Sequence, residues 1–134
     1  LDAACRPLSG TAFRVDVVRR LLSLTTSRRI RWQTASGEPR RQYDMGELMY
    51  IDFGVSSDVG PFHLLLYVWG SEIVLEITEE DGEWEVIKAR NGPLYHALGE
   101  LMEAAQDSVR HGYTIIGRFR DHLRGLEEHT ANCG

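Results

Sequence analysis

Residues 72–90, EIVLEITEEDGEWEVIKAR, decide the fold class of this 134-residue chain. Apolar and polar residues alternate on both sides of Asp81-Gly82, which is the pattern of two half-buried strands. Asp-Gly favours a two-residue turn between antiparallel strands, because both turn positions need a positive φ. The stretch therefore predicts a β-hairpin in which Ile77 lies opposite Val86.

This pairing gives the predicted hairpin two unlike faces, because successive side chains of a strand point to opposite sides. The first face is apolar and carries Ile73, Leu75, Ile77, Trp84 and Val86. The second face carries carboxylates, namely Glu72, Glu76, Glu83 and Glu85, together with Val74 and Ile87. We expect the first face to take the helices of the fold.

Three further strands are predicted before the hairpin. Residues 29–34 and 48–55 alternate between apolar and polar, and residues 62–69 are apolar on both sides, as in a central strand. Residues 56–61 predict the turn between the last two of these strands. Pairing Val55 with Phe62 then extends the acidic second face with the side chains of Tyr50, Asp52, His63, Tyr67 and Trp69.

Helical spacing of apolar residues appears at both ends of the chain. It predicts one helix from Ala12 to about Leu24, a second from Pro93 to the stop at Gly112, and a third over residues 115–128. Strands in one run and helices outside it favour an α+β fold. We therefore predict one globular domain over residues 1–134, with loose ends at about 1–10 and 130–134. Its antiparallel sheet has about five strands, one N-terminal helix and two C-terminal helices.

The charge of the chain is unevenly distributed. The net charge is −5, and residues 42–109 contain fourteen acidic residues against Lys88 and Arg90. A globally acidic chain is a poor nucleic-acid binder, because phosphate contacts dominate that affinity. An acidic segment of this kind instead suits a surface that docks on a basic protein partner.

No sequence motif for catalysis or cofactor binding stands out. There is no glycine-rich phosphate loop and no Cys/His cluster for zinc. Asp52 lies diagonal to His63 in the predicted strand pair, but no nucleophile accompanies them, and a structural pair is the more common arrangement. His96 and Glu100 share a helix face without a third metal ligand. The expectation is no catalytic set, no metal and no cofactor.

Cellular context is predicted from composition. Fourteen arginines against one lysine suggest a GC-rich bacterial genome, and no secretion leader or bilayer-spanning apolar run is present in the sequence. The expected location is the cytoplasm, without membrane association. Cys5 and Cys133 are either two free thiols or a disulfide between the two ends, and the sequence leaves this open.

The leading hypothesis is a non-enzymatic bacterial protein-binding module. Its docking surface would be the acidic, aromatic-bearing sheet face, formed by Tyr50, Asp52, His63, Tyr67, Trp69, Glu72, Glu76, Glu83 and Glu85. The layout of helix, antiparallel sheet and helices is similar to that of secretion chaperones and toxin-immunity proteins, and this resemblance implies a protein partner. In the alternative, a helix covers the aromatic half of this sheet face, its carboxylates are solvated, and no partner docks there.

Two other functions are compatible with the same residues. A small-ligand domain or enzyme would use a pocket around Asp52, His63, Tyr50 and Tyr67. A homodimeric structural module would join two copies through Trp69 and its neighbours, so the protein is expected to be a monomer or a homodimer.

Overall fold

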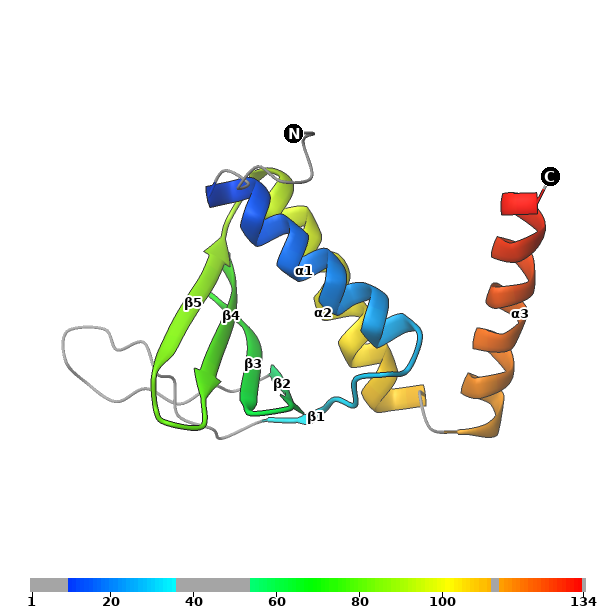
Figure 1. The fold of residues 1–134 in the computed structure, drawn as a ribbon, viewed down its shortest axis with the longest axis horizontal. Helices are drawn as coiled ribbons and strands as arrows, with labels where there is room; N and C mark the ends of the chain where they lie inside the picture. Colours follow the sequence, from blue (N-terminus) through cyan, green and yellow to red (C-terminus); the bar gives the residue numbers. More distant parts are fainter. Residues whose placement is uncertain (1–9, 36–53, 112–113, 134) are drawn as a thin grey trace, which may run out of the picture.

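The computed structural model describes residues 10–35, 54–111 and 114–133, with side chains described as far as Glu127. The elements are α1 (Gly10–Thr26), β1 (Gln33–Thr34), β2 (Gly54–Val59), β3 (Phe62–Trp69), β4 (Glu72–Glu79), β5 (Trp84–Ala89), α2 (Gly92–His111) and α3 (Ile115–Cys133) (Figure 1). The strands form one antiparallel sheet in the order β1-β2-β3-β4-β5. The predicted α+β fold, with one helix before the sheet and two after it, is confirmed.

Strand β2 lies later in the chain than predicted. It occupies residues 54–59, where the sequence predicted a turn, and Val55 lies opposite Leu66 rather than Phe62. Ser56 and Ser57 look like turn residues, but both are buried, and the Ser57 hydroxyl donates to the Arg31 carbonyl at 2.6 Å. The turn to β3 needs only Gly60-Pro61, with Gly60 at a φ of 57°. Residues 48–53 of the predicted strand lie outside the described residues.

The hairpin between β4 and β5 turns at the predicted place but with a different register. The Glu79 amide donates to the Glu83 carbonyl at 2.7 Å, and three residues separate these two positions. Gly82 is the third of them and has a φ of 99°, as expected for a three-residue turn that ends in a positive-φ residue. Ile77 therefore lies opposite Glu85, and the predicted pairing of Ile77 with Val86 is wrong.

A shift of one residue in the register exchanges the two faces of β5, because the side-chain period of a strand is two. Ile87 is buried with Leu75 on the side of the sheet that faces the helices. Val86 lies opposite Glu76 on the other side, where Trp84 and Lys88 also lie. The sequence predicted Trp84 and Val86 on the first face and Ile87 on the second, so these assignments are reversed.

Helices α1 and α2 cover one face of the sheet, which we call the helix-side face (Figure 1). Its core contains Leu64, Leu66, Ile73, Leu75 and Ile87 from the sheet, and Val18, Leu94, Ala97, Leu98, Leu101, Met102 and Ala105 from the helices. The buried spine of α2 follows the predicted apolar stripe. Burial of each large apolar side chain contributes about 1.5–3 kcal/mol, so this layer stabilises the fold.

The chain between α1 and β1 closes one end of this core. Ile30 and Trp32 are buried, as their alternation predicted, although only Gln33 and Thr34 form the strand. The Trp32 indole donates to the Thr25 hydroxyl at 2.9 Å. This hydrogen bond satisfies a buried polar group and fixes the segment to the end of α1.

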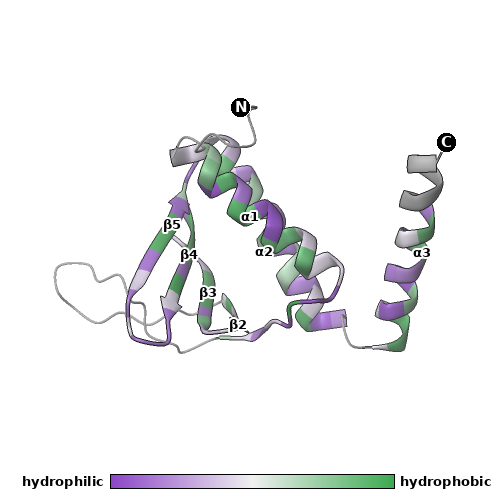
Figure 2. Cartoon of the chain, viewed as in Figure 1, coloured by the Kyte–Doolittle hydropathy of each residue, from purple (hydrophilic) through white to green (hydrophobic). Residues whose placement is uncertain are grey.

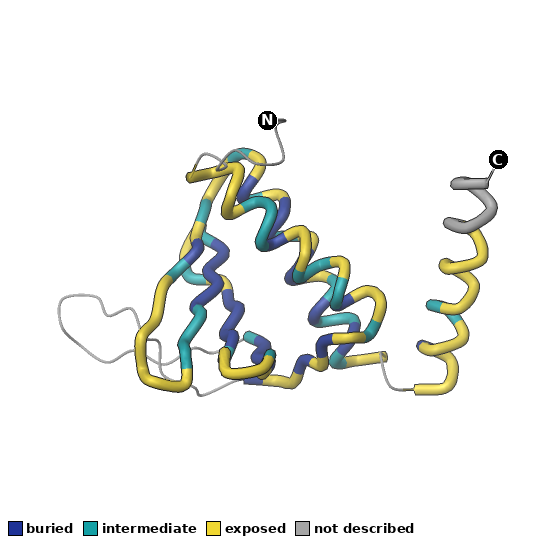
Figure 3. The backbone as a smooth tube through the Cα atoms, viewed as in Figure 1, coloured by how far each residue is buried: buried dark blue, intermediate teal, exposed yellow. Residues whose placement is uncertain are grey.

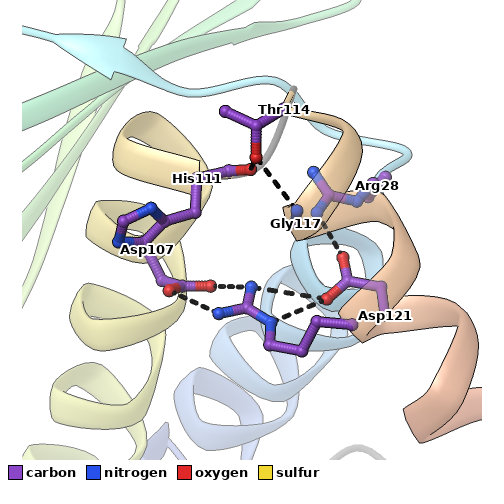
Figure 4. Close-up of polar contacts among 7 residues, drawn as sticks. Arg28, Asp107, His111, Thr114, Gly117 and Asp121 are labelled. Atoms are coloured by element: carbon purple, nitrogen blue, oxygen red, sulfur yellow. Dashed lines mark hydrogen bonds and ion pairs between the residues drawn. The ribbon is translucent and has the colours of Figure 1, made fainter.

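Helix α3 is attached to the rest of the molecule through its charged side (Figure 4). The Arg120 guanidinium donates to both oxygens of Asp107 on α2, at 3.0 and 2.5 Å. Arg28, after α1, forms an ion pair with Asp121 at 2.5 Å. The hydrogen bond from Arg120 holds the pKa of Asp107 below its ordinary value of 3.8. We refer to Arg28, Asp107, Arg120 and Asp121 as the α3 anchor.

The corner between α2 and α3 is tight. The Thr114 hydroxyl donates to the His111 carbonyl at 2.8 Å and accepts from the Gly117 amide at 2.9 Å. A Cβ atom on Gly117 would lie 1.9 Å from the His111 carbonyl oxygen. Only glycine fits this position, so Gly117 allows α3 to turn away from the end of α2.

Candidate protein-docking site

A hollow of about 240 Å³ opens at the turn end of the β4–β5 hairpin. It is lined by Phe62, Ile77, Glu79, Glu83, Trp84 and Glu85, which we call the acidic hollow. Phe62 lies opposite Glu79, and Ile77 lies opposite Glu85, so these four side chains share the helix-side face. Helices α1 and α2 lie over the other end of that face, and the hairpin end is left exposed (Figures 1 and 3).

Carboxylates dominate the rim of the acidic hollow. One oxygen atom each from Glu79, Asp81 and Glu83 lie within 4.8 Å of one another. Asp81 is held by the turn, because its carboxylate accepts from the Glu83 amide at 3.0 Å. All of the charged residues that line the hollow are acidic, so their fields add and attract cations.

Apolar groups form the walls between these carboxylates. Phe62 is 39% exposed, and Ile77 is half-buried on the same face. Trp84, which is 42% exposed and pairs with Thr78 on the other side of the sheet, also borders the hollow. An aromatic ring attracts a cation through its face and packs against the alkyl stem that carries it. The combination therefore suits the side chain of a lysine or an arginine.

The size of the acidic hollow favours a protein ligand over a small molecule. Pockets for drug-sized ligands and cofactors have volumes of about 300–1,000 Å³ and enclose most of the ligand. At about 240 Å³ and open to solvent at the end of a hairpin, the hollow is smaller than that range. Its dimensions fit one or two side chains of a partner.

The predicted acidic sheet face is divided by the observed register. Glu85, and with it Glu83, belongs to the acidic hollow on the helix-side face. Tyr67 and Glu76 lie on the opposite face, where both are buried, and the Tyr67 hydroxyl donates to the Glu76 carboxylate at 2.5 Å. These two side chains satisfy each other in the interior, so they contribute to the fold rather than to an exposed docking surface.

The remaining side chains of that predicted face lie around the buried pair. Trp69 is partly buried and meets the Tyr67 ring edge to face, with the ring centroids 6.4 Å apart. Glu72 lies opposite Trp69 at the Gly70-Ser71 turn and is half-buried. The predicted homodimer contact through Trp69 stays a prediction.

His63 has a carboxylate partner among the described residues that the sequence did not predict. Its ring nitrogen Nδ1 lies 2.8 Å from an oxygen of Asp58, which is its cross-strand neighbour. Asp52 and Tyr50, which the sequence placed around His63, lie outside the described residues. Since Tyr67 is buried and bonded to Glu76, the described part of the chain does not bring Tyr67 and His63 into one open pocket. The small-ligand alternative therefore gains no support from these two residues.

A larger cleft, of about 470 Å³, lies between α2 and α3. It is lined by Leu22, Glu100, Glu103, Ala104, Gln106, Asp107, Arg110, His111 and Arg124. Both signs of charge line it, and two of its carboxylates already bind arginines, Glu100 to Arg19 and Asp107 to Arg120. The Arg19 contact also occupies the carboxylate that His96 would have needed for a metal site.

Comparison with protein-family models, curated proteins and solved structures finds no match to this chain. No helix in the described part of the chain is long and apolar enough to cross a membrane. The function is therefore inferred from the geometry of the site alone.

Sequence reasoning identified Glu83 and Glu85 but missed Phe62, Ile77 and Glu79 as their companions on the same face. A two-residue turn places Trp84 in the core and Glu85 on the opposite face. The available signal was the run Glu79-Glu80-Asp81-Gly82, since a glycine after three polar residues also fits a three-residue turn. That alternative would have placed Ile77 and Glu85 side by side.

Proposed function

We propose that the protein is a non-enzymatic bacterial protein-binding module, comparable in role to an immunity protein or a chaperone. Its acidic hollow receives a basic side chain of a protein partner. The observation that carries the proposal is the grouping of three glutamates, Glu79, Glu83 and Glu85, around exposed aromatic and aliphatic walls. No cofactor, metal or nucleic acid takes part in this function.

The geometry supports a two-part mode of binding. The alkyl stem of a lysine or an arginine packs against Phe62 and Ile77, while its charged end lies among the carboxylates. Exposed ion pairs contribute only about 0.2–1 kcal/mol each, so the apolar walls supply much of the affinity. The carboxylates raise the association rate and select against acidic partners.

A peptide titration followed by NMR tests the proposal. The probe is a synthetic peptide of alternating arginine and leucine, and the control peptide replaces each arginine with glutamate. We expect the basic peptide to shift the signals of Phe62, Ile77 and Glu85, and the effect to decrease as salt is added, because salt screens exposed charges. The acidic peptide should leave these signals unchanged.

A pair of charge reversals locates the binding. Glu85→Lys should lower the affinity for the basic peptide roughly 5-fold, as expected when an attractive contact becomes repulsive. Glu103→Lys on α2 is the matched control, because it makes the same change of net charge at another exposed glutamate. Equal weakening by both variants, or peptide shifts that avoid the acidic hollow, would contradict the proposal.

A further inference from the structure

Helix α3 is oriented with its apolar side outward. Ile115, Ile116, Phe119, Leu123 and Leu126 are 43–81% exposed, and we call these residues the α3 apolar face. Figure 2 shows hydrophobic and hydrophilic segments alternating along the helix, and Figure 3 shows most of its described part as exposed. A surface helix of a globular protein normally turns such a stripe toward the core.

The charged side of α3 faces the body instead. Gly117 is buried at the corner with α2, and Arg120 and Asp121 bind Asp107 and Arg28. With 3.6 residues per turn, these positions occupy a different sector of the helix from the α3 apolar face. The α3 anchor therefore fixes the helix in an orientation that presents its apolar side to solvent (Figure 4).

The spacing of the α3 apolar face is that of a helix–helix seam. Ile116, Phe119, Leu123 and Leu126 are separated by three, four and three residues, which are the a and d positions of a heptad. No charged residue interrupts these four positions. A seam made only of apolar side chains is complementary to a second copy of itself.

The exposed area suits a pair of identical helices. The five side chains expose on the order of 500 Å² of apolar surface, which is near the largest patch of a typical monomer. Two copies that cover each other's faces would remove on the order of 1,000 Å² from water, which is near the lower limit of a specific interface. Figure 1 shows α3 at the outer side of the molecule, away from the sheet, so two copies can meet along its outward side.

We infer that α3 is a self-association helix, and that its apolar face pairs with the same face of a second copy of this chain. The inference is independent of the proposed function, because the acidic hollow lies on the hairpin at the other side of the molecule (Figure 1). In the dimer, each copy keeps its own hollow open for a partner.

Light scattering coupled to gel filtration, run on the full chain over a dilution series, tests the inference. The wild type should show twice the mass of a single chain and dissociate on dilution. Phe119→Asp should show the mass of one chain, since a buried charge in the seam is left without a partner. Circular dichroism of both proteins verifies that α3 remains folded in the variant.

Phe13→Asp is the matched control. Phe13 is 57% exposed on α1 and Phe119 is 60% exposed on α3, so the two variants make the same chemical change at equal exposure. The control should keep the mass of two chains. A wild type that has the mass of one chain throughout the series, or a Phe119→Asp variant that keeps the mass of two, would overturn the inference.

Discussion

Glu76 is only 1% exposed, which is unusual for a carboxylate, and it lies among the apolar side chains of the face opposite to the helices. Its hydrogen bond from the Tyr67 hydroxyl explains how it is accommodated there. Loss of a hydrogen bond to a buried charged group lowers the stability of the folded state. The pair is therefore a feature of stability, although the sequence suggested a surface for binding.

Tyr67→Phe removes the hydroxyl donor and keeps the ring. We expect the free energy of unfolding to fall by about 1–3 kcal/mol, because Glu76 loses a buried hydrogen bond. Urea denaturation followed by tryptophan fluorescence measures the change. Tyr95→Phe is the control, because the Tyr95 hydroxyl bonds to no described residue, and it should change stability by no more than about 0.5 kcal/mol. Equal losses in the two variants would count against the role of the buried pair.

Two glycines of α3, Gly117 and Gly125, allow the corner at the start of this helix to be tested. Gly117→Ala places a methyl group against the His111 carbonyl, so α3 must shift or fray. We expect amide hydrogen exchange in residues 115–121 to become about tenfold faster, which corresponds to about 1.4 kcal/mol. Gly125→Ala on the same helix meets no atom within 4 Å, and it should stabilise α3 by about 0.5–1 kcal/mol. Faster exchange in both variants would show that the corner is not the cause.

The α3 anchor makes the attachment of this helix dependent on pH. The pKa of Asp107 is lowered in the folded protein, so its hydrogen bond from Arg120 contributes stability above the ordinary value of 3.8. That contribution is lost as the pH falls through the lowered value in the folded state. The effect on stability is small, because both side chains are about a third exposed.

Carbon-detected NMR of the Asp107 carboxyl group measures this pKa directly. In the wild type we expect a midpoint below 3.8, and in Arg120→Gln a midpoint that moves up toward 3.8, since the largest cause of the shift is removed. Arg118→Gln removes the same charge two residues away, where the arginine is exposed. If both variants raise the midpoint equally, the lowered pKa of Asp107 is caused by the overall positive charge nearby rather than by the α3 anchor.

The helices and strands were largely predictable, whereas their registers were not. Long segments with a clear period, such as the apolar stripe from Leu94 to Ala105, identify their helix and its buried side directly. The strand at Ser56 and Ser57 was not recognised, because both serines are polar, and the buried Ser57 hydroxyl bonds to the carbonyl of Arg31, which is distant in sequence. The hollow was missed for a related reason, since Asp81-Gly82 is compatible with turns of two or three residues.

The two proposed surfaces of the molecule should respond differently to salt. The acidic hollow attracts its partner through charge, whereas the α3 apolar face associates by apolar burial. We expect added sodium chloride to weaken binding of the basic peptide severalfold without weakening self-association, because screening acts on charges. Peptide titrations and light scattering at low and high salt measure the two effects on the same sample. If salt weakened peptide binding and self-association equally, one surface would be responsible for both.

The three-residue turn at the end of β4 also determines which side chains of β5 face the helices. With the same sequence, a two-residue turn at Asp81-Gly82 would place Glu80 opposite Glu83 and rotate every later side chain of β5 to the other side of the sheet. Ile87 would leave the core, and Glu85 would leave the hollow. A substitution can alter one group of this surface, but a change from a three-residue to a two-residue turn in the same sequence exchanges the whole set. The face on which the acidic residues of β5 lie thus depends on the type of the turn as much as on the sequence of the strand.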